Sequence, residues 1–174
     1  TLYDLELPSS GKTVEYRPFL VREEKILLLA LEGGEEKEMS RAIKQIITQC
    51  VSTEGFDVNK IAMIDLEYLF LNIRGKAVGD ISTITFEHEC GETINLDIDL
   101  SKVKVVKNKK YSDLVKLTDD ITIRLTPPSI DNVIGAGDKN QIDMVLEIIR
   151  DSIVEIIQGE DVFSAQDHTR EELE

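Results

Sequence analysis

The sequence contains no tryptophan, only two cysteines among its 174 residues, and an aromatic fraction of 5%. With so few rings, the core must be filled mainly by isoleucine, leucine and valine, which disfavours functions based on aromatic stacking. Two cysteines, Cys50 and Cys90, do not make a disulfide scaffold at this length, and a reducing compartment fits them better. The longest apolar run, Ile26–Leu31, is about a third of the roughly 20 residues that span a bilayer, so a membrane helix is not expected.

Positive charge is also scarce, because 34 acidic residues face 20 lysines and arginines and give a formal net charge of −14. Such a surface repels phosphate, and nucleic-acid binding depends on basic residues that neutralise phosphates. Nucleic acid is therefore disfavoured as a partner, and no membrane partner is expected. Basic protein partners, or solubility alone, explain the charge better.

Residues 1–79 predict a hairpin followed by a helical lobe. Leu2–Leu7 and Thr13–Tyr16 alternate apolar and polar residues around a Pro-Ser-Ser-Gly turn, which is typical of two paired strands. Three segments with helical spacing and caps follow: Val21–Leu31, Glu35–Cys50, and Val58–Ile73 with Asp57 as its cap. Apolar residues cover more than one face of the first of these helices, so we expect it to be buried on most sides.

Residues 80–160 predict a small antiparallel sheet and a packing helix, and residues 161–174 an acidic tail or the start of a further segment. We expect two paired strands between Ile81 and Leu100, with an extension over Val103–Val106, and a further strand at Ile121–Leu125. A loop at 130–138 and a helix at Gln141–Ile157 should follow them. Thr169–Glu172 has a capping-box pattern that normally opens a helix, so we expect the chain to continue. The predicted fold class is α+β.

His88 and Cys90 have the spacing of half a metal knuckle. Structural zinc needs about four ligands of the Cys or His type, and the chain has only two of each, which favours a polar hairpin end. Gly33-Gly34 and the segment 135–139 lack the full spacing of a phosphate loop and are interpreted as a cap and a loop. No other catalytic motif is present in the sequence.

Asp97 and Asp99 lie two apart on a predicted strand, so both carboxylates share one face, and Asp119-Asp120 could approach them. Paired carboxylates can bind a hard cation or perform acid–base chemistry. In so acidic a chain, chance pairs are expected, and a solvated face of a half-buried sheet explains them better. A metal-dependent enzyme that uses Asp97, Asp99 and Asp119 stays as the less favoured alternative.

Four blocks of the sequence resemble the baseplate hub subunit family of contractile-tailed, T-even-type bacteriophages. They are Arg17–Leu28 followed by Glu32–Gly34, Ala42–Ile47, Asp65–Arg74, and Ile94–Leu100. The resemblance covers most of the chain to about residue 128, and none of the blocks is a chemical motif. Some relatives carry a Cys-x-x-Cys pair near the position of Cys90, but Glu87 stands three residues before it here, so zinc binding does not transfer.

The resemblance implies a non-enzymatic structural or assembly protein of the tail baseplate hub, which acts in the host cytoplasm during assembly and is retained in the virion tail. A transient assembly chaperone that is absent from the virion is the alternative. The implied partners are other baseplate or tail proteins, with homo-oligomers left open and no cofactor or small-molecule substrate. Five residues in the family-like blocks are the expected protein-binding site: Arg17, Phe19, Glu23, Glu24 and Arg74.

Overall fold

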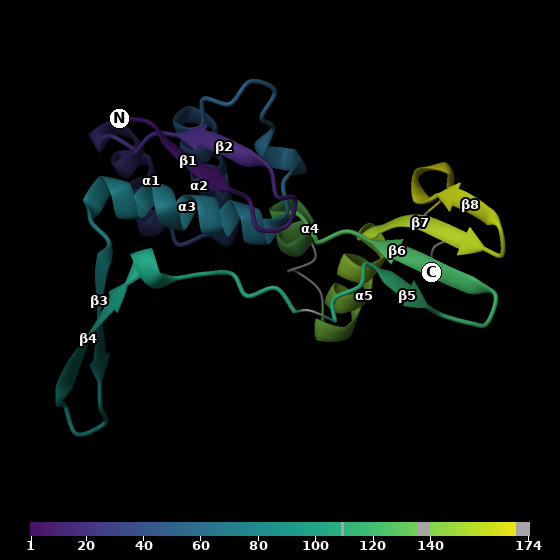
Figure 1. Ribbon diagram of the computed structural model, residues 1–174. Helices are drawn as coiled ribbons and strands as arrows, with labels where there is room; N and C mark the ends of the chain where they lie inside the picture. The colour runs from purple at the N-terminus through teal and green to yellow at the C-terminus, as the bar shows by residue number, and fades with distance from the viewer. Residues whose placement is uncertain (109, 136–139, 170–174) are drawn as a thin grey trace. The chain divides into compact units, whose positions relative to one another are not determined.

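A computed structural model describes residues 1–108, 110–135 and 140–169 of the chain. It contains mixed helices and small antiparallel sheets, which confirms the α+β class (Figure 1). The chain forms two compact units, Thr1–Val105 and Val106–Glu174. The division into residues 1–79, 80–160 and 161–174 concerns folding domains and stays a prediction.

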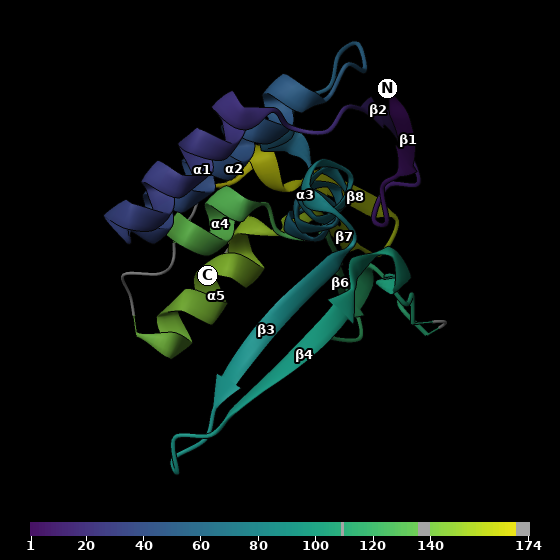
Figure 2. The same ribbon diagram turned by 90° about the vertical axis from the view of Figure 1, so that its left-hand side faces the viewer.

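The first unit opens with the predicted hairpin and three helices. The elements are β1 (Tyr3–Glu6), β2 (Thr13–Tyr16), α1 (Val21–Gly33), α2 (Glu36–Cys50), the 3-10 turn η1 (Val58–Lys60) and α3 (Met63–Val78). The strands are antiparallel and pair Tyr3 with Tyr16. The two-residue break between α1 and α2 depends on Gly34, which takes a φ of 71° at the C-terminal cap of α1. Figure 2 shows α1 and α2 side by side, and we call α1, α2 and α3 the helical lobe.

The core of the first unit lies between α2, α3 and the hairpin. The largest fully buried apolar side chains are Ile46, Ile47, Leu66, Leu69 and Ile73. Ile46, Ile47 and Cys50 follow the helical spacing predicted for α2, and their burial confirms that this face points inward. Aliphatic side chains therefore fill this core, as the shortage of aromatic residues predicts.

The N-terminal hairpin is tied to α3 by a buried carboxylate. Asp65, in the first turn of α3, accepts hydrogen bonds from the Ser9 backbone N–H at 2.7 Å and from the Ser9 hydroxyl at 2.5 Å. A carboxylate at this position also complements the positive end of the helix dipole. The turn of the hairpin is thereby held at the start of α3.

The boundaries of the third predicted helix were wrong at both ends. The Asp57 side chain does cap a turn, accepting from the Asn59 N–H at 3.0 Å, but only the short η1 follows it. An extended Ala62 then precedes α3, which continues to Val78. Gly75 lies within the helix, and a Cβ at that position would lie 2.8 Å from the Asp80 Oδ1 atom, so the Asp80 side chain would have to shift to accept a larger residue.

A two-stranded hairpin, which we call the arm, follows the lobe in the same unit. It consists of β3 (Ile81–Glu87) and β4 (Thr93–Asp99), antiparallel and paired with no other strand among the described residues. Figures 1 and 2 both show it extending away from the end of α3. The predicted extension over Val103–Val106 is wrong, because Asp99 caps the 3-10 turn η2 (Leu100–Lys102) and β4 ends there.

The second unit is a four-stranded antiparallel sheet in the order β5-β6-β7-β8 with two helices. Its elements are β5 (Leu114–Lys116), β6 (Ile121–Leu125), α4 (Ile130–Gly135), α5 (Gln141–Asp151), β7 (Ile153–Gln158), β8 (Asp161–Ser164) and the 3-10 turn η3 (Ala165–Asp167). The predicted strand at Ile121–Leu125 is confirmed. Residues 130–135 are helical rather than a loop, and β8 replaces the first part of the predicted tail.

The predicted helix over Gln141–Ile157 is a helix only as far as Asp151. The Ser152 hydroxyl donates to the Ile148 carbonyl at 2.7 Å at the helix end, and the β-branched residues that follow enter the sheet as β7. There Ile156 pairs with Ile123 on β6 and with Phe163 on β8. Residues 136–139 of the glycine-rich segment and residues 170–172 of the capping-box pattern lie outside the described residues.

Candidate protein-binding surface

Arg17 joins three elements at the junction between β2 and α1. Its backbone N–H donates to the Cys50 carbonyl at 2.9 Å, and its guanidinium donates to the Gln49 carbonyl at 3.0 Å. The same guanidinium forms an ion pair with Glu23 at 3.0 Å. Pro18, which cannot donate to a ladder, ends β2 at this point. Arg17 thus connects the end of β2, the first turn of α1 and the last turn of α2.

Glu23 is the fully buried acceptor of this cluster, with 0% of its surface exposed. Its carboxylate accepts from Arg17, from Arg22 Nε at 2.7 Å and from the Leu20 backbone N–H at 2.7 Å. The bond to Leu20 is the return half of a capping box, in which a glutamate in the first turn satisfies the N–H at the helix start. The bonds to both arginines and to Leu20 compensate the burial of this charge.

The environment of Glu23 favours its ionised form. Burial by itself raises the pKa of the carboxyl group, but the hydrogen bonds from Arg22, Arg17 and the Leu20 N–H outweigh it and lower the pKa from 4.5 to about 2. A buried charge with these partners orients α1 relative to β2 and α2, and removing one partner leaves a buried group unpaired.

The structure brings together only part of the predicted site. Phe19 is 7% exposed and is buried in the first unit, two residues after Arg17 in the sequence. Glu24, the next residue of α1, is half-buried. Arg74 lies on α3, where its Nη1 atom is buried without a hydrogen-bond partner among the described residues. No hydrogen bond or ion pair within the described ranges joins Arg74 to Arg17 or Glu23.

The outward side of α1 exposes three leucines next to the polar residues Lys25 and Glu32, which the sequence-based expectation missed. Leu28, Leu29 and Leu31 are 58%, 57% and 59% exposed, whereas Glu23 and Ala30 form the buried side. The prediction that this helix is buried on most sides is therefore wrong. Within its unit α1 packs mainly on α2, and no further layer covers its other side. We call Leu28, Leu29 and Leu31 the α1 face.

The acidic residues considered as metal ligands have other roles in the structure. Asp97 accepts from the Thr83 hydroxyl at 2.6 Å across the arm, and Asp99 caps η2 and pairs with Lys102 at 3.0 Å. Asp119 pairs with Lys116 at 2.9 Å in the second unit. Over the ranges that the structure describes, no three His, Cys, Asp or Glu side chains come together as a candidate metal site.

His88 and Cys90 lie in the turn at the tip of the arm. The His88 Nδ1 atom is 3.1 Å from the Cys90 sulfur, and Gly91 turns the chain with a φ of 85°. The Cys90 thiol is exposed, whereas Cys50 is buried in the lobe. The predicted polar hairpin end therefore matches their position.

None of the described helices is long and apolar enough to cross a membrane.

Comparison with known protein families decides the identity of the chain. A family model described as T4 bacteriophage base plate protein matches residues 1–174. The chain belongs to this family. No curated protein and no solved structure matches it in the corresponding searches. The resemblance to a T4-type phage baseplate protein is thus confirmed over the whole length.

Membership makes this base plate protein a structural component of a bacteriophage tail. Such a component works through the surfaces that it presents to neighbouring proteins, so its exposed apolar surfaces are the relevant sites. The α1 face is one of them. The second lies on the arm, where we expected a half-buried sheet and where residues 83–97 are exposed on both faces. The sequence predicts the two alternating strands and the tight turn, but it also predicts a helix that packs on the sheet, so this exposed surface was missed.

Proposed function

We propose that this base plate protein is a non-enzymatic subunit of the baseplate hub that binds other tail proteins through its helical lobe. The single observation that carries the proposal is the α1 face, where three leucines are more than half exposed on a helix whose opposite side is anchored. Several large apolar side chains exposed together on one side of a helix are typical of a protein interface.

The predicted site residues support this surface by orienting it. Arg17 and Glu23 connect α1 to β2 and to the end of α2, and Phe19 is buried in the same unit. A rigidly held helix loses less conformational entropy when it docks, which favours affinity. Glu24 is half-buried on α1 beside this cluster, and Arg74 has a buried guanidinium nitrogen that has no hydrogen-bond partner among the residues that the structure describes. We assign Glu24 as a polar contact at the edge of the interface, and Arg74 as a separate polar contact on α3.

Binding of the full chain to other baseplate proteins tests the proposal. In a Leu28→Gln/Leu29→Gln variant we expect co-purification with baseplate proteins from infected cells to fall by about tenfold or more, since each leucine contributes about 1.5 kcal/mol or more on burial. Lys12→Gln is the matched control, because it introduces the same side chain at an exposed position outside α1, in the turn of the N-terminal hairpin. Unchanged binding by the double variant in a stably folded protein would refute the proposal.

Purified virions separate the hub subunit from an assembly chaperone. We expect the chain to be present in virions at a fixed ratio to other baseplate proteins by quantitative mass spectrometry. A chaperone acts in the host cytoplasm and leaves before the particle is complete, so its absence from virions would favour that role instead.

A further inference from the structure

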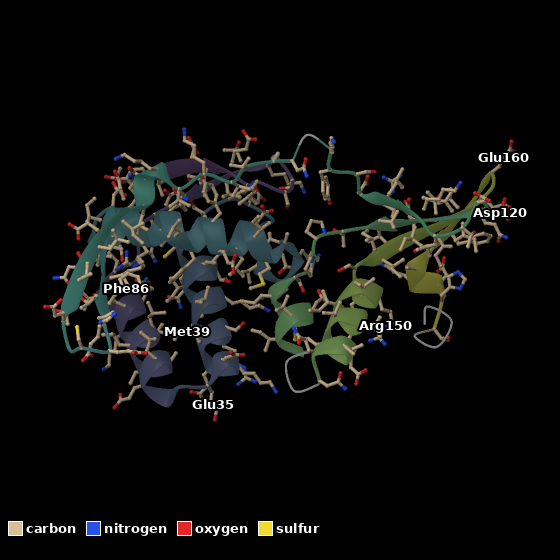
Figure 3. All side chains as sticks on the ribbon, turned by 90° about the horizontal axis from the view of Figure 1, so that it is seen from below. Glu35, Met39, Phe86, Asp120, Arg150 and Glu160 are labelled. Carbon is tan, nitrogen blue, oxygen red and sulfur yellow. The ribbon has the colours of Figure 1, made fainter. Side chains whose placement is uncertain are left out.

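The arm has one apolar face and one polar face. The register places Ile84 opposite Leu96 and Phe86 opposite Ile94, with Ile98 beside them on the same side. Phe86, Ile94 and Leu96 are 54%, 67% and 50% exposed, and Figure 3 labels Phe86 in this position. We call these five residues the arm face. On the other side, the Thr83 and Thr85 hydroxyls donate to Asp97 and Asn95.

A hairpin with an uncovered apolar face is not expected to be stable by itself. A two-stranded hairpin alone is marginally stable in water, and stability requires a third strand or a packed apolar face. The base of the arm is anchored, because the Leu100 N–H donates to the Asp80 carbonyl at 2.7 Å and η2 packs on α3. The arm face itself has no such support within its unit. The apolar side chains of the arm face are therefore available for contact with a partner.

The charge around the arm face selects the kind of partner. Between Ile81 and Leu100 there is no lysine or arginine, and the carboxylates in this stretch are Glu87, Glu89, Glu92, Asp97 and Asp99. Three of them surround the tip. Phosphate and anionic lipid would be repelled, and the arm of a second copy would bring the same carboxylates and no basic residue, in a chain of net charge −14. The complementary partner is a protein with basic residues.

We propose that the arm face docks onto another tail protein, on an apolar strip flanked by lysine and arginine side chains. The apolar strip covers Phe86, Ile94 and Leu96, and the basic flanks meet the carboxylates at the tip. This docking surface is distinct from the α1 face. The arm proposal extends the proposed function. It rests on that function in one respect, which is that the partner is a protein of the baseplate.

Cys90 supplies a direct test of what covers the arm. Its thiol is exposed at the tip while Cys50 is buried, so a thiol-specific photo-crosslinker reacts with the native full chain at this position. After irradiation in extracts of infected cells, we expect crosslinked peptides from one other tail protein, in a segment with apolar residues next to lysine or arginine. The adduct should be lost in a Phe86→Thr/Ile94→Thr variant. Crosslinks to a second copy or to residues 106–174 of the same chain, or no adduct beyond that of the variant, would overturn the proposal.

Titration of the identified partner with purified full chain then measures each contribution. Phe86→Thr/Ile94→Thr keeps β-forming residues and should weaken binding by about tenfold or more, as truncation of buried interface anchors does. The matched control Thr83→Ser/Thr85→Ser on the polar face should leave the affinity unchanged. Glu87→Gln/Glu89→Gln/Glu92→Gln should flatten the dependence of affinity on salt. An affinity that is insensitive to the arm-face variant, or a salt dependence that survives the triple variant, contradicts the proposal.

Failure of this proposal can be told apart from failure of the proposed function. If the Leu28→Gln/Leu29→Gln variant loses its baseplate partners while the arm variants retain theirs, the lobe binds and the arm does not. If the arm variants lose the crosslinked partner while the α1 variant keeps every partner, the arm is the interface and the lobe assignment is wrong.

Discussion

The helical lobe and the arm use similar aliphatic side chains in opposite ways. In the lobe, Ile46 on α2 and Leu69 on α3 are fully buried, because other elements of the same unit pack against them. In the arm, Ile94 and Leu96 lie on an equally regular apolar face that nothing in its unit covers. Burial of such residues contributes about 1.5–3 kcal/mol each. The lobe therefore obtains this free energy by folding, and we expect the arm to obtain it by binding.

Truncation of the lobe core should have the largest effect on stability. Leu69 is fully buried on α3, so Leu69→Ala removes apolar contacts and leaves a cavity. We expect a loss of about 2–5 kcal/mol in the free energy of unfolding. Chemical denaturation of the full chain measures it. Leu28→Ala on the exposed side of α1 is the control. Equal losses of stability in both variants would contradict the distinction between the buried core and the exposed α1 face.

Breaking the Arg17–Glu23 cluster should cost slightly less. Glu23→Gln keeps the shape of the side chain but leaves the guanidinium of Arg17 without its buried anion. We expect about 3 kcal/mol of destabilisation, as for other buried ion pairs that lose one partner. Glu24→Gln, at the half-buried neighbouring position, is the matched control. If both substitutions had the same small effect in thermal unfolding, the ion pair of Glu23 would not stabilise the lobe.

Acid should remove the contribution of Glu23 without mutation. Its pKa is lowered to about 2 in the folded protein, so its contribution is fully present above about pH 4.5 and is lost as the pH falls towards 2. The maximum is about 3 kcal/mol, because the pKa is lowered from 4.5 to about 2 in the folded protein. Denaturant titrations at several pH values should show the wild-type and Glu23→Gln stabilities converging near pH 2. A constant difference between them would show that ionisation is not the cause.

Loss of the Ser9 hydroxyl should have a smaller effect. Ser9→Ala removes one of two hydrogen bonds to the buried Asp65 carboxylate and keeps the bond from the backbone N–H. A hydrogen bond to a charged group contributes about 1.5–3 kcal/mol, so we expect a loss near the lower value. Ser10→Ala in the same turn is the control for the effect on the unfolded chain. Identical unfolding midpoints for Ser9→Ala and wild type would exclude this role for Asp65.

The smallest effect on stability is expected in the arm. Phe86→Thr/Ile94→Thr changes exposed side chains that pair only with each other and their neighbours across the arm, so the free energy of unfolding should change by about 1 kcal/mol or less. The same variant should abolish the crosslink at Cys90. A loss of stability comparable to that of Leu69→Ala would mean that the arm face is already covered within the chain.

Several elements could be predicted because local patterns were unambiguous. The inward face of α2 follows helical spacing, and both hairpins have alternating strands around turn residues. The boundary between α5 and β7 could not be predicted, since isoleucines continue through Ser152 and satisfy both periods. For the candidate site, the sequence placed Arg17 and Glu23 in one block, but their ion pair and their bonds to α2 and Leu20 depend on the packed lobe.

The sequence by itself determined the acidic character, the aliphatic core, most of the helices and strands, and the family of this base plate protein. Only the tertiary structure decided that the leucines of α1 face outward and that the arm face is uncovered. The physical reason is that periodicity specifies which residues share a face, whereas burial depends on whether another segment lies against that face. For the α1 face and the arm face, no such segment lies within the first unit.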